Sequence, residues 1–165
     1  MKIEGSCHCG AVRFRGETHT PVPYQRCYCS ICRKTAGGGG YAINIMAEAD
    51  SLQVEGMDQV RQYHAHLPDP TRPGEVIVSQ SARHFCGNCG SALWISDPRW
   101  PDWIYPFASA IDTALPVPPE RVHMMTEFAA PWVEIRRGQW EIHVRGYPKE
   151  SIEDWHRNRQ LYVPD

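Results

Sequence analysis

The seven cysteines of this chain constrain its fold more than any other feature, because they stand in three short groups. The groups are Cys7-x-Cys9, Cys27-x-Cys29-x-x-Cys32 and Cys86-x-x-Cys89. Ordinary buried cysteines are the plain alternative, but chance would not gather every cysteine into pairs and a triplet. An odd number of cysteines behind an N-terminus that lacks an apolar signal segment disfavours a disulfide framework. The pattern therefore predicts metal ligation, with zinc as the metal.

The first and third groups share one chemistry, because each pair is followed directly by a glycine. In the third group the short loop can place two sulfurs on one ion, and the glycine permits the left-handed backbone that such a turn needs. We expect Cys7 and Cys9 on a strand, where positions i and i+2 face the same side about 7 Å apart. The two pairs predict a closed structural zinc site, with the ligands Cys7, Cys9, Cys86 and Cys89.

The middle group supplies three thiolates from Cys27, Cys29 and Cys32. Two tetrahedral ions need eight ligands, so one corner is left to another side chain, to water or to an incoming ligand. Three protein ligands with one open position are typical of a catalytic zinc. A closed site is the alternative, with a histidine as the fourth ligand, and the candidates are His8, His64, His66 and His84.

Length and composition indicate one mainly β domain over residues 1–165. The chain has 14 prolines and 13 glycines, which suit short strands joined by turns. Ser151 and Asp154 resemble a capping box that opens a short C-terminal helix. The strands are expected at residues 11–14, 41–46, 52–55, 61–65, 76–81, 92–95, 102–109, 123–128, 133–135 and 140–144.

Charge and hydropathy exclude two classes of partner. The formal net charge is −2, so the chain as a whole is not drawn to nucleic acid or to an anionic membrane. No stretch approaches the roughly 20 apolar residues that span a bilayer. We therefore expect a cytoplasmic protein without nucleic-acid or membrane partners.

Three sequence motifs resemble the glutathione-dependent formaldehyde-activating enzyme family, which is grouped with centromere protein V. They are GSCHCGAVRF at residues 5–14, CYCSICRK at 27–34 and FCGNCGSAL at 85–93. A weaker match extends to Asp112, His123 and Trp132. The chain departs from the family where Tyr28 replaces a common histidine, and it carries a proline-rich insertion at residues 67–74.

The resemblance implies an Mss4-like fold of several antiparallel sheets around two zinc sites. It places the structural zinc on the two cysteine pairs and the catalytic zinc on the triplet. It also implies a carbon–sulfur lyase that forms or cleaves S-hydroxymethylglutathione or a related S-hydroxyalkyl thiol. Glutathione or another small thiol and a small aldehyde would be the partners.

Chemistry favours the same use of the triplet. Three thiolates leave a zinc site with a net charge of −1, which makes hydrolysis by bound hydroxide less natural than the capture of an external thiolate. A non-enzymatic zinc or thiol binder is the main alternative. An interaction module is another, although the slightly acidic chain carries no basic extension.

Cations beside the triplet are candidates to anchor the carboxylates of glutathione. Arg26, Arg33 and Lys34 flank the cysteines directly, and solvated surface charges are the plain alternative. Tyr28 either directs its hydroxyl toward substrate or packs as a supporting aromatic. His123 could shuttle a proton and Trp132 could wall the pocket, or both belong to the core.

Overall fold

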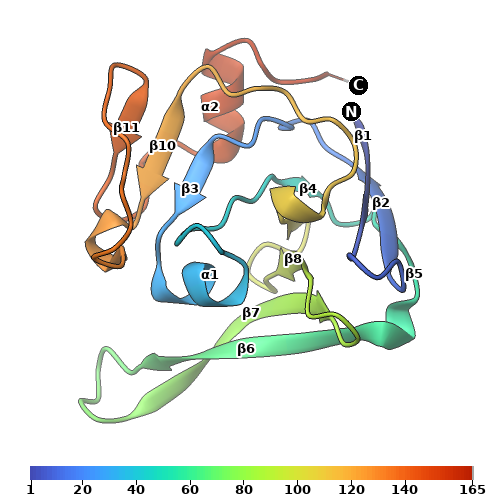
Figure 1. The fold of residues 1–165 in the computed structure, drawn as a ribbon, viewed down its shortest axis with the longest axis horizontal. Helices are drawn as coiled ribbons and strands as arrows, with labels where there is room; N and C mark the ends of the chain where they lie inside the picture. Colours follow the sequence, from blue (N-terminus) through green and yellow to red (C-terminus); the bar gives the residue numbers. More distant parts are fainter. Residues whose placement is uncertain (165) are drawn as a thin grey trace.

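The computed structural model describes residues 1–164 and shows a mainly β chain with three sheets and a short C-terminal helix (Figure 1). The first sheet has the order β1-β2-β5, and all its pairs are antiparallel. Its strands are β1 (Lys2–Ser6), β2 (Arg13–Glu17) and β5 (Gln53–Glu55). Buried and exposed residues alternate along β1 and β2, so one face of this sheet covers the core.

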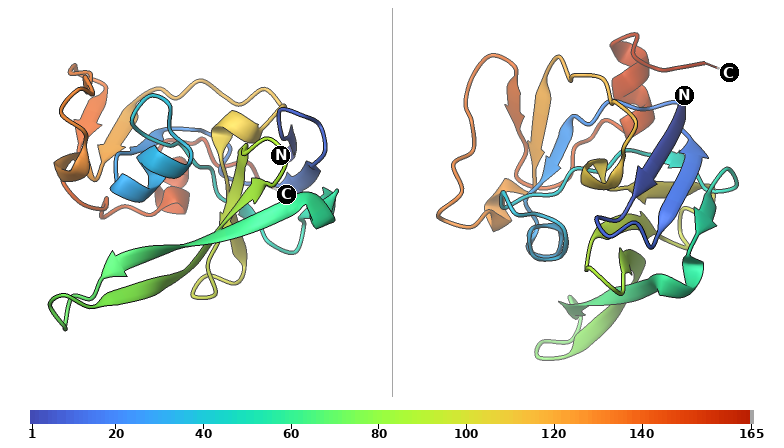
Figure 2. Two further views of the ribbon diagram at one scale, coloured as in Figure 1. Left: turned by 60° about the horizontal axis from the view of Figure 1, so that its bottom comes forward. Right: turned by 45° about the vertical axis from the view of Figure 1, so that its right-hand side comes forward.

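The largest sheet is antiparallel, in the order β4-β9-β8-β7-β6. Its strands are β4 (Ala47–Glu48), β6 (Val60–Pro68), β7 (Val76–Cys86), β8 (Ala92–Ser96) and β9 (Trp103–Pro106). Only the second half of β7, between Ala82 and Phe85, pairs with β8. The far half of the β6–β7 hairpin therefore extends beyond the sheet, as Figure 2 shows.

The third sheet is parallel, whereas antiparallel sheets were expected from the sequence. Strand β10 (Arg121–Met124) lies between β3 (Gln25–Cys27) and β11 (Glu141–His143), and it runs parallel to both. Parallel neighbours need long connections, and the chain supplies them because these three segments are far apart in sequence. This sheet brings the 121–143 region beside the cysteine triplet.

The expected C-terminal helix is confirmed as α2 (Ile152–Asn158). Ser151 caps it by accepting a hydrogen bond of 3.0 Å from the backbone N–H of Asp154. The ring of Trp155 stacks on Tyr24 with centroids 3.6 Å apart. His156 accepts a hydrogen bond from the Val22 N–H and donates to the carbonyl of its own first turn. These contacts hold α2 against the segment that leads into β3.

Two expected strands are absent from the described residues and one unexpected helix is present. Residues 41–46 form only isolated bridges, such as Cys27 with Ala42, and residues 133–135 form a loop. The unexpected helix is α1 (Ser30–Thr35), which starts directly after Cys29. Short 3-10 turns occupy Met57–Gln59, Ala108–Ala110 and Thr126–Phe128.

The main core lies between the first sheet, the largest sheet and α1. Phe14 meets Trp94 edge to face, and Val12 and Leu93 are fully buried beside them. Cys7, Cys32 and Cys86 belong to this cluster, whereas Cys9 and Cys89 are exposed. Buried cysteines thus anchor each sulfur group to the core. None of the helices formed by residues 1–164 is long and apolar enough to cross a bilayer.

Candidate metal centres and the adjoining cleft

The four cysteines of the two pairs meet in space, as expected. Their sulfurs all lie within 4.8 Å of one another. The Sγ atoms of Cys7 and Cys9 are 3.5 Å apart, and those of Cys9 and Cys86 are 3.8 Å apart. Tetrahedral zinc with bonds of about 2.3 Å needs sulfurs roughly 3.8 Å apart. The donor set therefore fits a zinc ion.

The expected strand position of Cys7 and Cys9 is wrong, because both lie in a turn that follows β1. The turn closes with a hydrogen bond of 3.0 Å from the Gly10 N–H to the Cys7 carbonyl. The second pair lies in a turn one residue longer, which closes with 2.9 Å from the Gly90 N–H to the Cys86 carbonyl. Both glycines have φ of +74°, where a side chain would be strained. Two glycine-ended turns, rather than a strand and a loop, present the four sulfurs.

The triplet is positioned by the junction of β3 and α1. Cys27 ends β3, Cys29 precedes the helix, and Cys32 lies buried within it. The Cys29 sulfur caps α1 by accepting a hydrogen bond of 3.3 Å from the Cys32 N–H. Hydrogen bonds from the Cys27 and Cys32 thiols, and from this N–H, hold the pKa of Cys29 well below its usual range. Cys29 thus favours the thiolate form, which can bind a cation.

The three sulfurs of the triplet also lie within 4.8 Å of one another, and no other ligand type joins them in residues 1–164. The histidines considered as a fourth ligand are engaged or placed elsewhere. His64 Nδ1 lies 2.9 Å from the Ser79 carbonyl, and His84 Nε2 lies 3.0 Å from the Ser96 hydroxyl. The described chain therefore offers three ligands at this site, one fewer than a tetrahedral ion takes.

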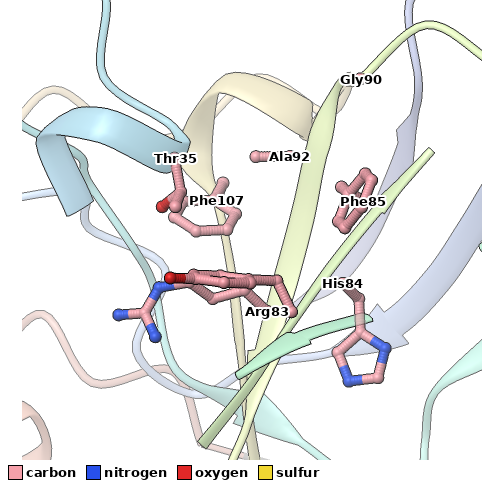
Figure 3. Close-up of a pocket in the computed structure, with 8 residues that line it drawn as sticks. Thr35, Arg83, His84, Phe85, Gly90, Ala92 and Phe107 are labelled. Atoms are coloured by element: carbon pink, nitrogen blue, oxygen red, sulfur yellow. The ribbon is translucent and has the colours of Figure 1, made fainter. Parts of the chain in front are cut away.

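A cleft of about 410 Å³ lies beside the end of α1, and none of the triplet cysteines lines it. Its walls are mainly apolar and include Phe85, Phe107 and Ala92, with Thr35 at the end of α1. Arg83 of β7 also lines it, and the Nη2 atom of Arg83 lies 3.9 Å from the Cys32 sulfur. Figure 3 shows the Arg83 side chain extending toward the side of α1, whereas His84 points the other way. Arg83 thus connects the cleft with the sulfur site.

Tyr28 is buried, and its hydroxyl belongs to a hydrogen-bonded chain rather than to an open surface. Its oxygen lies 2.7 Å from His123 Nδ1, and His123 Nε2 lies 2.7 Å from a Glu141 carboxylate oxygen. Burial lowers the pKa of His123, which keeps the ring neutral. The carboxylate can only accept, so Nε2 carries the proton and the Tyr28 hydroxyl donates to Nδ1. This chain joins β3, β10 and β11 behind the triplet.

The flanking cations take different positions. The guanidinium of Arg26 lies over the ring of Tyr41, 4.9 Å from its centroid. Arg33 is half-buried on α1, with an Nε atom that has no hydrogen-bond partner in residues 1–164. Lys34 is exposed on the same helix. Trp132 is 67% exposed, and it approaches the glycine loop at Gly40.

Sequence reasoning missed three residues near the triplet. Arg83 and Glu141 come from distant strands, and only the pairing of those strands brings them to the site. The third is Tyr147, which is 74% exposed as a residue. Desolvation of its hydroxyl and the charges of the triplet sulfurs raise the pKa of Tyr147. Spacing along the sequence gives no signal for any of them.

Fold and site together define a small β protein with two cysteine clusters that can hold metal ions, one with four ligands and one with three. The profile of the family described as "Glutathione-dependent formaldehyde-activating enzyme" matches residues 2–127. The chain belongs to this family.

Relatives agree with the assignment. A protein of Halomonas elongata, provisionally named a glutathione-dependent formaldehyde-activating enzyme, is 56% identical over 156 residues, which cover 94% of this chain and 95% of that protein. The crystal structure of a Rhodobacter sphaeroides protein is similar with a TM-score of 0.50 and 26% identity, covering 68% of this chain and 91% of that one.

Proposed function

We propose that this protein is a zinc-dependent carbon–sulfur lyase that forms or cleaves S-hydroxymethylglutathione or a related S-hydroxyalkyl thiol. The observation that carries the proposal is the three-sulfur group with no fourth ligand among the described residues. Arg83, whose Nη2 atom lies 3.9 Å from the Cys32 sulfur, links this group to a cleft large enough for a small molecule. Family membership and the name of the Halomonas elongata relative support glutathione and formaldehyde as the substrates.

The two cysteine clusters suit different roles. Four ligands complete a tetrahedral ion and leave no position for substrate, so Cys7, Cys9, Cys86 and Cys89 would hold a structural zinc. Cys27, Cys29 and Cys32 would hold the catalytic one. Zinc at the triplet would supply a fourth position at which a thiol is kept as the nucleophilic thiolate at neutral pH.

In the forward direction the thiol sulfur bonds to the aldehyde carbon, and the aldehyde oxygen takes up a proton to become a hydroxyl. The reverse reaction breaks the carbon–sulfur bond and restores thiol and aldehyde. Hemithioacetals form without a catalyst, so holding the two reactants together is the main task of the protein. Tyr28 and His123 are bonded to each other in the interior, and their role is to support the β3–α1 junction.

The seven thiols are free, which suits a compartment that keeps thiols reduced and supports a cytoplasmic location. A non-enzymatic zinc or thiol binder would use the same open corner. Turnover separates the two, because a binder takes up thiol without accelerating adduct formation or cleavage.

The test is the absorption of the cobalt-substituted protein during titration with glutathione. Thiolate-to-cobalt bands report the number of sulfur ligands, so we expect a saturable increase as a fourth sulfur joins the triplet. Cys29→Ser should abolish this increase, whereas the four-sulfur site should keep its own bands. An unchanged spectrum in the wild-type protein would show a closed site and would refute the proposal.

A further inference from the structure

Arg83 is a buried cation without a carboxylate partner. It is only 9% exposed, and its Nε atom has no hydrogen-bond partner within residues 1–164. Among the ion pairs of the described chain, none includes it. Burying an unpaired charge is costly, and such groups are normally paired with an acid or with a bound ligand.

The contact of Arg83 with the triplet does not use its full capacity. A guanidinium has five N–H donors in a planar fork, which matches the two oxygens of a carboxylate. Within residues 1–164 its one side-chain hydrogen bond is the long one of 3.9 Å to the Cys32 sulfur. This contact helps to balance the negative charge of the thiolates, and it leaves other N–H donors of the guanidinium for a second anion.

The walls of the cleft around Arg83 suit an organic anion as the second partner of the guanidinium. Phe85, Phe107 and Ala92 present apolar surface beside the guanidinium. In such surroundings a charged hydrogen bond is screened less than it is in water. A small carboxylate would find one strong partner there, and its carbon chain would lie against apolar walls.

We propose that Arg83 is a specificity-determining residue, which binds a carboxylate of the thiol whose sulfur joins the triplet. The inference rests on the proposed function and deepens it. It selects thiols whose carboxylate can reach Arg83 while the sulfur is at the triplet, such as mercaptocarboxylates or glutathione through its glycine carboxylate. Arg26, Arg33 and Lys34, which flank the triplet in sequence, do not line this cleft.

The test compares 3-mercaptopropionate with 3-mercaptopropionamide, which differ in charge but hardly in shape. Both are titrated into the cobalt-substituted protein, and the thiolate-to-cobalt band reports binding. We expect the wild-type protein to prefer the carboxylate by about tenfold or more, as the loss of a charge-assisted pair predicts. Arg83→Gln should lose this preference and still bind the amide.

Two further variants complete the design. Arg61→Gln removes one charge from an exposed residue of the neighbouring strand β6 and should keep the wild-type preference. Arg83→Lys keeps a cation but loses the fork, so an intermediate preference is expected, and it carries the test if Arg83→Gln does not fold. Wild-type preference in both Arg83 variants, or no preference in the wild-type protein, would overturn the inference.

A measurement without a free thiol separates this inference from the proposed function. Saturation-transfer NMR follows 3-(methylthio)propionate, which has the carboxylate but cannot bind as a thiolate. Transfer to this probe in the wild-type protein and its loss in Arg83→Gln would support the carboxylate site even if neither thiol changes the cobalt spectrum. Absence of transfer in the wild-type protein would overturn it, whatever the cobalt spectrum shows.

Discussion

Replacing Tyr28 with phenylalanine should test the support of the triplet most directly. The change removes only the hydroxyl oxygen. The ring is 1% exposed, so the phenylalanine ring should keep the same packing. His123 Nδ1 then loses the one donor that residues 1–164 offer it, the Tyr28 hydroxyl at 2.7 Å, in a residue that is 0% exposed. An acceptor left buried without a partner costs about 1–3 kcal/mol.

For a chain of this length, a loss of about 2 kcal/mol lowers the unfolding midpoint by roughly 4–8 °C. Urea denaturation of zinc-loaded protein should show the same loss as a lower midpoint with an unchanged slope. Because Tyr28 stands between two triplet ligands, we also expect about tenfold weaker zinc binding at the triplet, measured by competition with a chelator.

Tyr63→Phe is the matched control for stability. This ring is 43% exposed on β6, so loss of its hydroxyl should change the unfolding free energy by less than about 0.5 kcal/mol. If Tyr28→Phe is equally mild, the hydrogen bond to His123 does not stabilise the fold. Nitrogen-15 NMR adds an independent check, because a proton on Nδ1 of His123 would show that the donor and acceptor roles are reversed.

Two other predictions concern the sulfur sites and pH. Cys86→Ser should impair folding, because Cys86 is fully buried in the four-sulfur site. Cys29→Ser should instead give a folded protein that binds one zinc ion fewer. Equal losses of thermal stability in the two variants would contradict the division into structural and catalytic sites. Burial lowers the pKa of His156 below the unfolded value of about 6.5, so the unfolded chain takes up the proton first and stability falls as pH drops through 6.5 toward the folded pKa. Urea denaturation at pH 7.5 and 5.5 should show a loss of stability in the wild-type protein that exceeds the loss in His156→Gln by up to about 1.4 kcal/mol, and equal losses would exclude this role of His156.

The parts of the fold that short-range chemistry controls were predictable from the sequence. Glycine after Cys9 and Cys89 indicated two cysteine pairs of one kind, and both glycines are left-handed in the structure, which brings the four sulfurs together. Ser151 marked the start of α2 for a similar local reason, the side-chain cap. In both cases the residues that make the structure are neighbours in sequence.

The parts that depend on distant segments were not predictable. Helix α1 is six residues long and is capped by a cysteine sulfur, so neither its length nor its cap resembles an ordinary helix signal. Strand β3 has three residues and becomes a strand only through its pairing with β10. Arg83 looks like any other basic residue until β6 and β8 enclose β7.

The position of the four-sulfur cluster has a consequence for how the chain folds. Cys9 and Cys86 are 77 residues apart in sequence, so an ion held by both closes a loop of that length. Closing such a loop costs about 4 kcal/mol of free energy through lost chain entropy. The chain meets this cost before metal binding at the cluster can offset it. The N-terminal turn should therefore join the metal late, after the β7–β8 hairpin has formed, and a nascent chain would remain open to chelators until its middle third has been synthesised.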